Sequence, residues 1–295
     1  MIGFLSTILP SEGVYFIASI KGGVCRHYPC RSFGKMVQKA NELDAQGCDV
    51  FFACASFKQE SYIGDDGKRY QRTAENAGWV NSFWLDIDCG ADKAAKGTGY
   101  ATLNEALAAL LSFIIAVGLP KPIFVLSGGG LHIYWPLTET ITKEQRLPVA
   151  RQLKDLTLCP AIRLIADNAR TSDIASILRP IGTHNYKPER NGAVVTQRID
   201  GEPTAFDELS QIISKAHHTH CGGSVRPTRG LQLATALSTS DPETQETVAR
   251  AKSALAAINP DCEYPEWRDI CCAVHALNWS CSEELARSWS KGDLI

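Results

Sequence analysis

Several patterns that define particular protein classes are missing from this sequence. Its 295 residues include 11 cysteines, but no two have the Cys-x-x-Cys spacing of a zinc ribbon, and the odd, scattered set gives no disulfide framework. The longest apolar run, residues 106–117, is too short to cross a bilayer. No basic segment precedes the first apolar residues, which argues against a secretory signal. We therefore expect a cytoplasmic protein with reduced thiols and no membrane partner.

A strong excess of charge is missing as well. The formal net charge is −2, so a surface that binds phosphates would have to be local. The nucleotide-binding pattern Gly-x-x-x-x-Gly-Lys-Ser/Thr does not occur, so any helicase activity lies outside this sequence. With 44% hydrophobic and 21% charged residues, the composition is that of a globular protein with room for one large domain and a small appendage.

Two acids alternate with apolar residues at the end of a predicted strand that begins at Val80. Side chains of a strand point to alternate faces, so Asp86 and Asp88 project from one face. Leu85 and Ile87 point from the other face into a core. Carboxylates placed in this way can bind a divalent metal. Taken alone, however, an Asp-x-Asp pair more often belongs to a strand that ends in a polar turn.

A second polar segment, Ser127-Gly128-Gly129-Gly130, joins two predicted strands and leads to His132. Hairpin turns usually prefer Asn-Gly or Asp-Gly, whereas three glycines let a bulky group such as a triphosphate approach the backbone. Ser127, Gly128 and Gly130 are therefore candidate nucleotide-binding residues. A single His in a strand is usually structural, and it is the preceding Ser-Gly-Gly-Gly that makes His132 a candidate donor to a phosphate.

A third segment, residues 178–187, gathers basic side chains around a turn that a proline and a glycine define. It contains Arg179, His184 and Lys187. Arginine can form a forked pair with phosphate oxygens, and lysine acts as a point charge. Apolar residues flank the cluster and bring it close to a core, which favours a polyphosphate site over a solvated turn.

The pattern of periodicity divides the chain into three parts. Residues 1–216 are expected to form one domain, and residues 217–240, which lack periodicity, a linker. The linker contains a His/Cys cluster, residues 217–223, but without the separated ligand pairs of a zinc site, so zinc is not favoured. Residues 241–295 are expected to form a small helical domain with helices over 243–258, 265–277 and 282–289.

Residues 56–79 are expected to form a long polar loop. A loop of this length in a compact domain is more often functional or mobile than idle. Its basic residues would either guide a nucleic-acid template or simply be solvated, and we leave both interpretations open. They are Lys58, Lys68, Arg69 and Arg72.

The polar segments, taken in order, resemble the motifs of the archaeo-eukaryotic primase superfamily, and more narrowly those of the primase-polymerases of phages and plasmids. The resemblance covers residues 10–205. It implies an α+β fold, in which a core related to the RNA-recognition-motif fold has an N-terminal α/β unit beside it and the active site in the cleft between. The motifs are Asp86-Ile87-Asp88, Ser127-Gly128-Gly129-Gly130-Leu131-His132-Ile133-Tyr134-Trp135, a later Asp, and Leu178-Arg179-Pro180-Ile181-Gly182-Thr183-His184-Asn185-Tyr186-Lys187.

The resemblance also implies that three acids hold two divalent metal ions. Asp86 and Asp88 would be two of the ligands, and carboxylate oxygens favour Mg²⁺ or Mn²⁺ over zinc. The third acid is open between two residues. Asp167 ends an apolar run twelve residues before Arg179, whereas Asp173 is nearer and lies in a Thr-x-Asp context. We favour Asp167, with Asp173 as the alternate.

The nucleotide-binding roles follow from the same resemblance. Ser127 and His132 would bind phosphate, and His132 would contact the triphosphate of the incoming nucleotide. Arg179 and Lys187 would neutralise the triphosphate tail, and Asn185 would support that turn.

The last part of the chain carries a weaker resemblance, to the helical domain that follows the catalytic core in many phage primases. It rests on Glu266-Trp267-Arg268 and Arg287-Ser288-Trp289-Ser290. In those proteins the domain is tied to priming and to the link with a helicase. The chain stops about where this domain should continue. We therefore expect the N-terminal fragment of a longer protein, with a helicase in the same full-length chain or in its replisome.

Taken together, these motifs predict a template-dependent DNA primase-polymerase of a mobile replicon in a bacterial host. Its partners would be a single-stranded DNA template and deoxy- or ribonucleoside triphosphates. Two alternatives remain. One is a metal-dependent transferase that uses the Asp-x-Asp pair to hold a nucleotide-sugar diphosphate. The other is a non-catalytic replication-initiator module that binds DNA and whose acids bind no metal.

Overall fold

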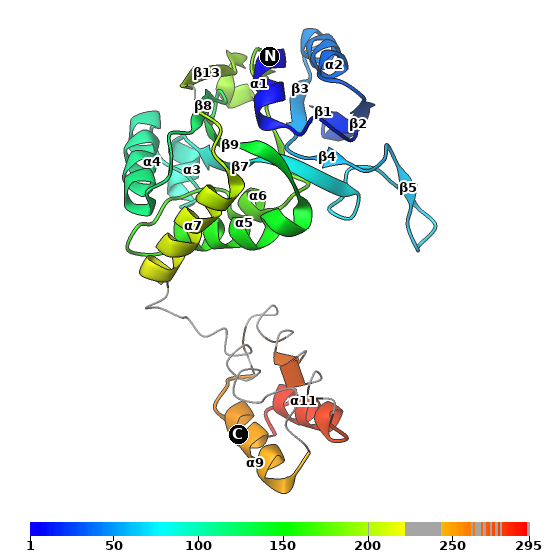
Figure 1. Cartoon of the computed structure of the whole chain (residues 1–295), viewed down its shortest axis with the longest axis vertical. Coiled ribbons are helices and arrows are strands. Elements are labelled where there is room, and N and C mark those ends of the chain that lie inside the picture. The colour runs from blue at the N-terminus through cyan, green and yellow to red at the C-terminus, as the bar shows by residue number, and fades with distance from the viewer. Residues whose placement is uncertain are drawn as a thin grey trace. The chain divides into compact units, whose positions relative to one another are not determined.

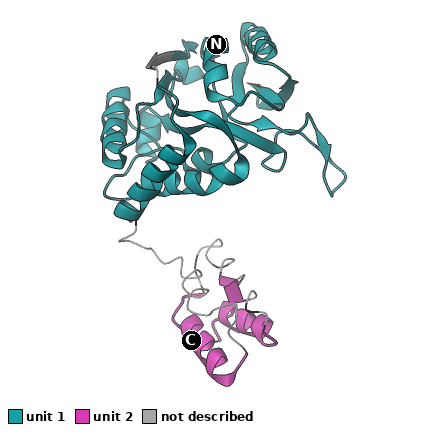
Figure 2. Cartoon of the chain, viewed as in Figure 1, with its two compact units in different colours: residues 1–223 teal, residues 224–295 magenta. Residues whose placement is uncertain are grey.

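The computed structural model divides into two compact units, unit 1 (Met1–Gly223) and unit 2 (Ser224–Ile295) (Figure 2). In its described part, no helix has both the length and the apolar character needed to cross a membrane. The structure describes residues 1–199, 201–221, 243–260, 262, 267, 270, 271, 273, 274, 277 and 279–293.

A five-stranded antiparallel sheet forms the centre of unit 1 (Figure 1). Its two long strands, β7 and β9, pair along most of their length. The strand order is β13-β8-β9-β7-β4, and the strands span Thr196–Ile199, Ile123–Leu126, Gly130–Thr142, Ala77–Asp88 and Ser56–Phe57 respectively.

The two long strands have the alternation that the sequence predicts. Leu85 and Ile87 are completely buried, which confirms their place in the core. Asp86 lies directly opposite His132 in the β7–β9 ladder, so both side chains project from the same face of the sheet. The first acid of the Asp-x-Asp pair and the histidine after the glycine turn are therefore cross-strand neighbours.

Helices cover the apolar face of this sheet. α4, α5 and α7 contact one another or the strands β7 and β9 (Figure 1). Local signals fix their ends: Thr142 and Gln145 form a capping box for α5, and Gly118 ends α4 in the left-handed conformation. The helices of this layer are α4 (Leu103–Val117), α5 (Lys143–Leu158) and α7 (Phe206–Cys221), with the short α3 (Ala91–Ala95) and α6 (Asn168–Ser172) at the edge of the site.

A second, four-stranded sheet faces the polar side of the first. An aromatic cluster joins the two: Tyr134 of β9 packs against Phe4 of α1 and Phe52 of β3, with ring centroids 5.4 and 6.4 Å away. This arrangement confirms the α+β class and the N-terminal α/β unit. The sheet has the order β10 (Ile177–Leu178), β3 (Asp49–Ala53), β1 (Tyr15–Lys21), β2 (Val24–Cys30), and α1 (Ile2–Ile8) and α2 (Phe33–Ala45) pack near it.

The polar stretch 56–79 is not one continuous loop. It contains β4, the hairpin β5–β6 (Tyr62–Ile63 and Arg69–Tyr70) and the start of β7. The rings of Tyr62 and Tyr70 lie 5.7 Å apart and stabilise the hairpin. Two-residue strands are too short to show an alternating pattern, which explains why the sequence suggests a loop. Arg72, one of its basic residues, is half-buried and donates to His27 and to the carbonyl of Ala175, so it is held by protein groups.

Helix α7 continues through Cys221, so the first residues assigned to the linker are helical. The residues after Ala216 include no proline or glycine before Cys221, so the helix can continue. His217 also pairs with Asp155 of α5 at 3.4 Å. The rest of the predicted linker lies outside the described residues. Three short elements complete unit 1: β11 (His184–Asn185), β12 (Ala193–Val194) and the 3-10 turn Pro188–Arg190.

Unit 2 is helical where it is described. Helices α9 (Gln245–Ala256) and α11 (Ser282–Ser290) match two of the three expected helices. Trp289 is completely buried, and its indole N–H donates to the carbonyl of Ile258 at 3.0 Å. Trp267 donates to the hydroxyl of Ser290 at 2.9 Å. Most of the third expected helix, over residues 265–277, lies outside the described residues.

Candidate active site

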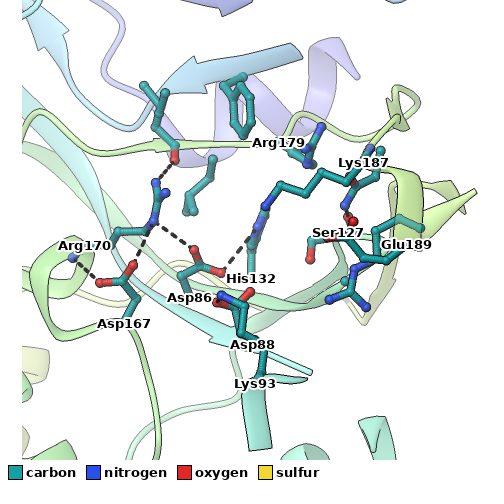
Figure 3. A pocket seen from close by; sticks show the side chains of 16 residues that line it. Asp86, Asp88, Lys93, Ser127, His132, Asp167, Arg170, Arg179, Lys187 and Glu189 are labelled. Carbon is teal, nitrogen blue, oxygen red and sulfur yellow. Dashed lines mark hydrogen bonds and ion pairs between the residues drawn. The ribbon is translucent and has the colours of Figure 1, made fainter. Parts of the chain in front are cut away.

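The polar pocket of unit 1 lies between the two sheets (Figure 3). The strands β7 and β9 supply one wall, and β3 and β10 supply the other. Three aspartates gather at one end with Lys93 and Arg170 beside them, and the other end holds Ser127, Arg179, Lys187 and one acid, Glu189 (Figure 3). They are Phe51, Asp86, Asp88, Lys93, Ser127, Gly129, His132, Asp167, Arg170, Ile177, Leu178, Arg179, Asn185, Lys187, Glu189 and Arg190.

Three aspartates meet at the acidic end. Asp86 and Asp88 lie at the C-terminal end of strand β7, and the side chain of Asp86 is only 15% exposed. Asp167 comes from the segment before α6, and its backbone N–H donates to the carbonyl of Asp86 at 2.8 Å. Its carboxylate caps α6 by accepting from the N–H groups of Ala169 and Arg170. Asp173, the alternate third acid, is exposed at the other end of α6 and is not among the residues that line the pocket.

Each of these acids has a cation beside it. The Nε atom of Arg170 lies 3.1 Å from Oδ2 of Asp86 and 3.1 Å from Oδ2 of Asp167, so one N–H is shared between two carboxylates (Figure 3). The Nζ atom of Lys93, on α3, lies 2.6 Å from Oδ2 of Asp88. The acidic end is therefore charge-compensated by the chain itself.

Burial is the main influence on the pKa of the Asp86 carboxyl. Burial, partly offset by Arg170, raises the pKa of the Asp86 carboxyl to about 7. The charges of Asp88 and Asp167 raise this pKa as well, and Lys187 lowers it. A divalent cation in contact with such a carboxyl favours its charged form.

The donor set fits a hard metal ion, but not in its present arrangement. Asp86, Asp88 and Asp167 supply carboxylate oxygens, the ligands that Mg²⁺ and Mn²⁺ prefer. Within the described residues, however, no group of three or more His, Cys, Asp or Glu side chains is arranged so that it could hold a metal ion as it stands. In this arrangement Arg170 pairs with Asp86 and Asp167, and Lys93 pairs with Asp88.

His132 links the acids to the basic end of the pocket. Its Nε2 lies 3.7 Å from Oδ1 of Asp86, and its Nδ1 is buried without a hydrogen-bond partner in the structure. Burial, reinforced by Arg179 and Arg170, lowers the pKa of His132 to about 3, so the ring is neutral near pH 7. A neutral imidazole has one N–H to donate, and its buried Nδ1 has no partner among the protein atoms that the structure describes.

Arg179, like His132, is buried and has one nitrogen without a hydrogen-bond partner in the structure. It is 3% exposed, and its Nη1 pairs with Oδ1 of Asp49 at 2.7 Å, while its Nη2 is buried without a partner in the structure. Its guanidinium also lies over the ring of Phe51, 4.5 Å from the centroid. Lys187 extends across the same end of the pocket (Figure 3). The basic end therefore offers both a fixed fork and a longer cationic side chain.

Hydrogen bonds join the glycine turn to the basic turn. The amide of Asn185 donates to the carbonyl of Ser127 at 3.0 Å, and the backbone N–H of Lys187 donates to Oδ1 of Asn185 at 3.3 Å. Asn185 thus links the two turns, and the supporting role that the family resemblance implies for it stays a prediction. His184 is different: its ring pairs with Asp44 at 2.8 Å and does not line the pocket. Successive residues of β11 point to opposite sides, so His184 and Asn185 cannot both face the site.

The glycines of the turn are packed against protein atoms. A Cβ at Gly130 would overlap the carbonyl oxygen of Ile87, and a Cβ at Gly128 would lie 3.0 Å from Cβ of Asn185. Of the three glycines, Gly129 lines the pocket, whereas Gly128 and Gly130 are not among the lining residues. Their smallness brings strands together, which differs from the expectation that it admits a triphosphate.

Three cations of the pocket are not among the sequence-predicted site residues: Lys93, Arg170 and Arg190. The signal for Arg170 is present in the sequence, because it follows Asp167 by three residues and the two form an i,i+3 pair on α6. Lys93 and Arg190 reach the site through tertiary packing. Arg190 donates to the carbonyl of Cys89 at 2.7 Å.

No family model and no curated protein matches the sequence. The solved structures similar to the chain include the following three. The AEP domain of the primase-polymerase of cyanophage S-2L has a TM-score of 0.46 at 17% identity, over 68% of this chain and 89% of that one. The catalytic domain of primase RepB′ in complex with initiator DNA has a TM-score of 0.42 at 17% identity, over 77% and 96%. A second structure of primase RepB′ has a TM-score of 0.41 at 15% identity, over 98% and 92%.

Proposed function

We propose that this protein is a template-dependent DNA primase-polymerase, a nucleotidyltransferase that acts in phage or plasmid replication. One observation carries the proposal: a single pocket brings three aspartates together at one end and places the neutral donor His132 and the cations Arg179 and Lys187 beside them, with Glu189 as one further acid at the cationic end. A nucleoside triphosphate in complex with divalent metal ions has the complementary distribution of charge. The ordered sequence motifs supply the choice of nucleotidyl transfer over other metal-dependent chemistry.

The acidic end suits the reacting centre. Nucleotide joining is an in-line displacement in which a 3′-hydroxyl attacks the α-phosphorus and pyrophosphate leaves. Asp86, Asp88 and Asp167 would hold two Mg²⁺ or Mn²⁺ ions, which supply a lowered pKa at the attacking hydroxyl and charge stabilisation at the leaving group. Asp167 is anchored to the carbonyl of Asp86 through its own N–H, so the loop that carries it keeps a fixed position beside β7.

The basic end suits the triphosphate. The two buried unpaired groups, Nδ1 of His132 and Nη2 of Arg179, would donate to phosphate oxygens, with His132 in the tautomer that carries its proton on Nδ1. Because His132 is neutral near pH 7, it donates a hydrogen bond without adding charge. Lys187 would add a mobile positive charge, and Ser127 a hydroxyl at the start of the glycine turn.

The partners follow from this chemistry. We expect a single-stranded DNA template and deoxy- or ribonucleoside triphosphates as substrates. Pairing of the incoming base with the template would provide the sequence readout, so the protein needs contacts to phosphates and sugars more than to base edges. A helicase in the same full-length chain or in the replisome is the expected further partner, and unit 2 is the part of this chain that would connect to it.

The proposal is tested with an unprimed single-stranded template, labelled nucleoside triphosphates and Mn²⁺. The double variant Asp86→Ala/Asp88→Ala should make no product. The matched control Asp207→Ala/Glu208→Ala removes two exposed charges from the first turn of α7, outside the pocket, and should remain active. Failure of the wild-type protein to make template-dependent product on varied templates would contradict the proposal.

The same experiment separates the two alternatives. A nucleotide-sugar transferase would release nucleoside diphosphate from a nucleotide sugar with no need for DNA. A non-catalytic initiator module would bind DNA equally well with EDTA or with Asp86→Ala, and would make no product.

A further inference from the structure

Arg170 makes contacts on both sides of the cleft between the sheets. Its Nε is shared between Oδ2 of Asp86 on β7 and Oδ2 of Asp167, and its Nη1 donates to the carbonyl of Ile177 on β10 at 2.6 Å (Figure 3). Its own carbonyl accepts from the indole of Trp84 at 2.8 Å and from the hydroxyl of Ser176 at 3.0 Å. Backbone and side chain of Arg170 are therefore both fixed.

This position conflicts with metal binding at the same carboxylates. The Nε of Arg170 donates a hydrogen bond to Oδ2 of Asp167 and forms an ion pair with Oδ2 of Asp86, so it contacts one oxygen of each acid. A divalent ion that bridges the two acids would need oxygens directed toward itself and would repel a guanidinium in direct contact with them. Binding of one metal by both acids would therefore compete with the Nε contacts of Arg170.

We propose that Arg170 is a built-in competitor of the metal ions, a positioning residue that holds Asp86 and Asp167 in a charge-balanced, closed arrangement until a metal displaces it. This inference rests on the metal site of the proposed function. It adds a specific consequence. Arg170 lowers the affinity of the protein for metal, and its removal tightens metal binding.

The contact with Ile177 gives the displacement a defined geometry. Ile177 belongs to β10, which pairs with β3, so the Nη1 bond ties Arg170 to the second sheet and not to the acids. When the Nε contacts are released, this bond and the bond from Trp84 keep the residue at the mouth of the acidic end. Among the described residues the Nζ of Lys93 pairs with Asp88 alone, so this side chain can turn toward solvent more easily.

The test is a Mn²⁺ titration of the full chain, followed by electron paramagnetic resonance, with no nucleotide or DNA present. Arg170→Gln should bind Mn²⁺ at least about tenfold more tightly than the wild-type protein, which corresponds to about 1.4 kcal/mol. A residue that only maintained the fold would give the opposite sign, since its loss would disorder the ligands and weaken binding. The sign of the change therefore separates competition from a structural role.

Arg163→Gln is the matched control. Arg163 lines the neighbouring groove together with Asp88 and Asp167, but in the described part of the chain no ion pair joins it to either acid. Its removal changes the net charge by the same amount and should tighten Mn²⁺ binding by less than about threefold, because an exposed charge is screened. A larger change in Arg163→Gln than in Arg170→Gln would overturn the inference.

A second variant, Arg170→Lys, covers the case in which Arg170→Gln does not fold. Lysine keeps the charge but lacks the planar fork that contacts Asp86 and Ile177 together, so its Mn²⁺ affinity should lie between those of the wild type and Arg170→Gln. The inference is overturned if every folded Arg170 variant binds Mn²⁺ with the affinity of the wild type or more weakly. It is also overturned if neither the wild type nor any variant binds Mn²⁺. If the Arg170 variants bind Mn²⁺ more tightly while the wild type makes no template-dependent product, the competition stands and the proposed function fails.

Discussion

Gly130 is the residue at which a single methyl group should disturb the site most. It lies opposite Asp88 in the β7–β9 ladder, and a Cβ there would overlap the carbonyl oxygen of Ile87 and lie 3.0 Å from Cα of Asp88. These are backbone atoms, so relief requires the two strands to separate. Overpacking of this kind costs about 1–3 kcal/mol, and we expect Gly130→Ala to fall near about 3 kcal/mol because no flexible side chain can move aside.

Gly129→Ala is the matched control one residue away. The nearest atom to its added Cβ would be Nε of Arg190 at 2.9 Å, which belongs to a side chain that can move. We expect a change in stability within about 0.5 kcal/mol. Displacement of Arg190 from the pocket should instead weaken nucleotide binding, so the two neighbouring substitutions separate stability from function.

Amide hydrogen exchange of β7 and β9 peptides measures this difference locally, which matters because the two units of the chain need not unfold together. A loss of about 3 kcal/mol speeds exchange through the opened state by about a hundredfold in Gly130→Ala. Exchange in Gly129→Ala should match the wild-type protein. Equal protection of β7 and β9 in Gly130→Ala and in the wild type would refute the packing argument.

Three further substitutions test individual contacts. Asp167→Asn should lower nucleotide incorporation at least about a hundredfold through the loss of a metal ligand, whereas Asp173→Asn should keep near-normal incorporation; the reverse result in a synthesis assay would exchange their roles. Arg179→Lys should raise the KM for nucleotide about tenfold because lysine lacks the fork, and an unchanged KM would remove Arg179 from the nucleotide site. Asn185→Ala leaves the buried carbonyl of Ser127 without its donor and should destabilise unit 1 by about 1–3 kcal/mol in urea unfolding; unaltered stability would contradict this role.

Local patterns were enough to predict the strands of the site. The alternation around Asp86 and the alternation after the glycine turn place Asp86 and His132 on the correct faces. Their pairing across β7 and β9 follows once the two strands are neighbours. The caps of α4 and α5 are local as well, because each depends on residues three positions apart or fewer. These features depend on backbone geometry, which is encoded in adjacent residues.

The partners of the charged side chains could not be predicted in the same way. Arg179 pairs with Asp49, and His184 with Asp44, across more than a hundred residues of chain, so the basic turn contains fewer available cations than its sequence indicates. Lys93 lies in a glycine- and lysine-rich segment whose sequence has no pattern that relates it to Asp88. Charge pairing of this kind depends on which segments the fold brings together.

The most direct test of the central claim is the composition of the product made on templates of known sequence. Unprimed oligo(dT) and oligo(dC) are each incubated with the full chain, all labelled nucleoside triphosphates and Mn²⁺. The proposed function predicts that oligo(dT) directs incorporation of adenine nucleotides and oligo(dC) of guanine nucleotides, and that EDTA or Asp86→Ala/Asp88→Ala abolishes both products. Products of the same composition on both templates, or no metal-dependent product on either, would contradict it.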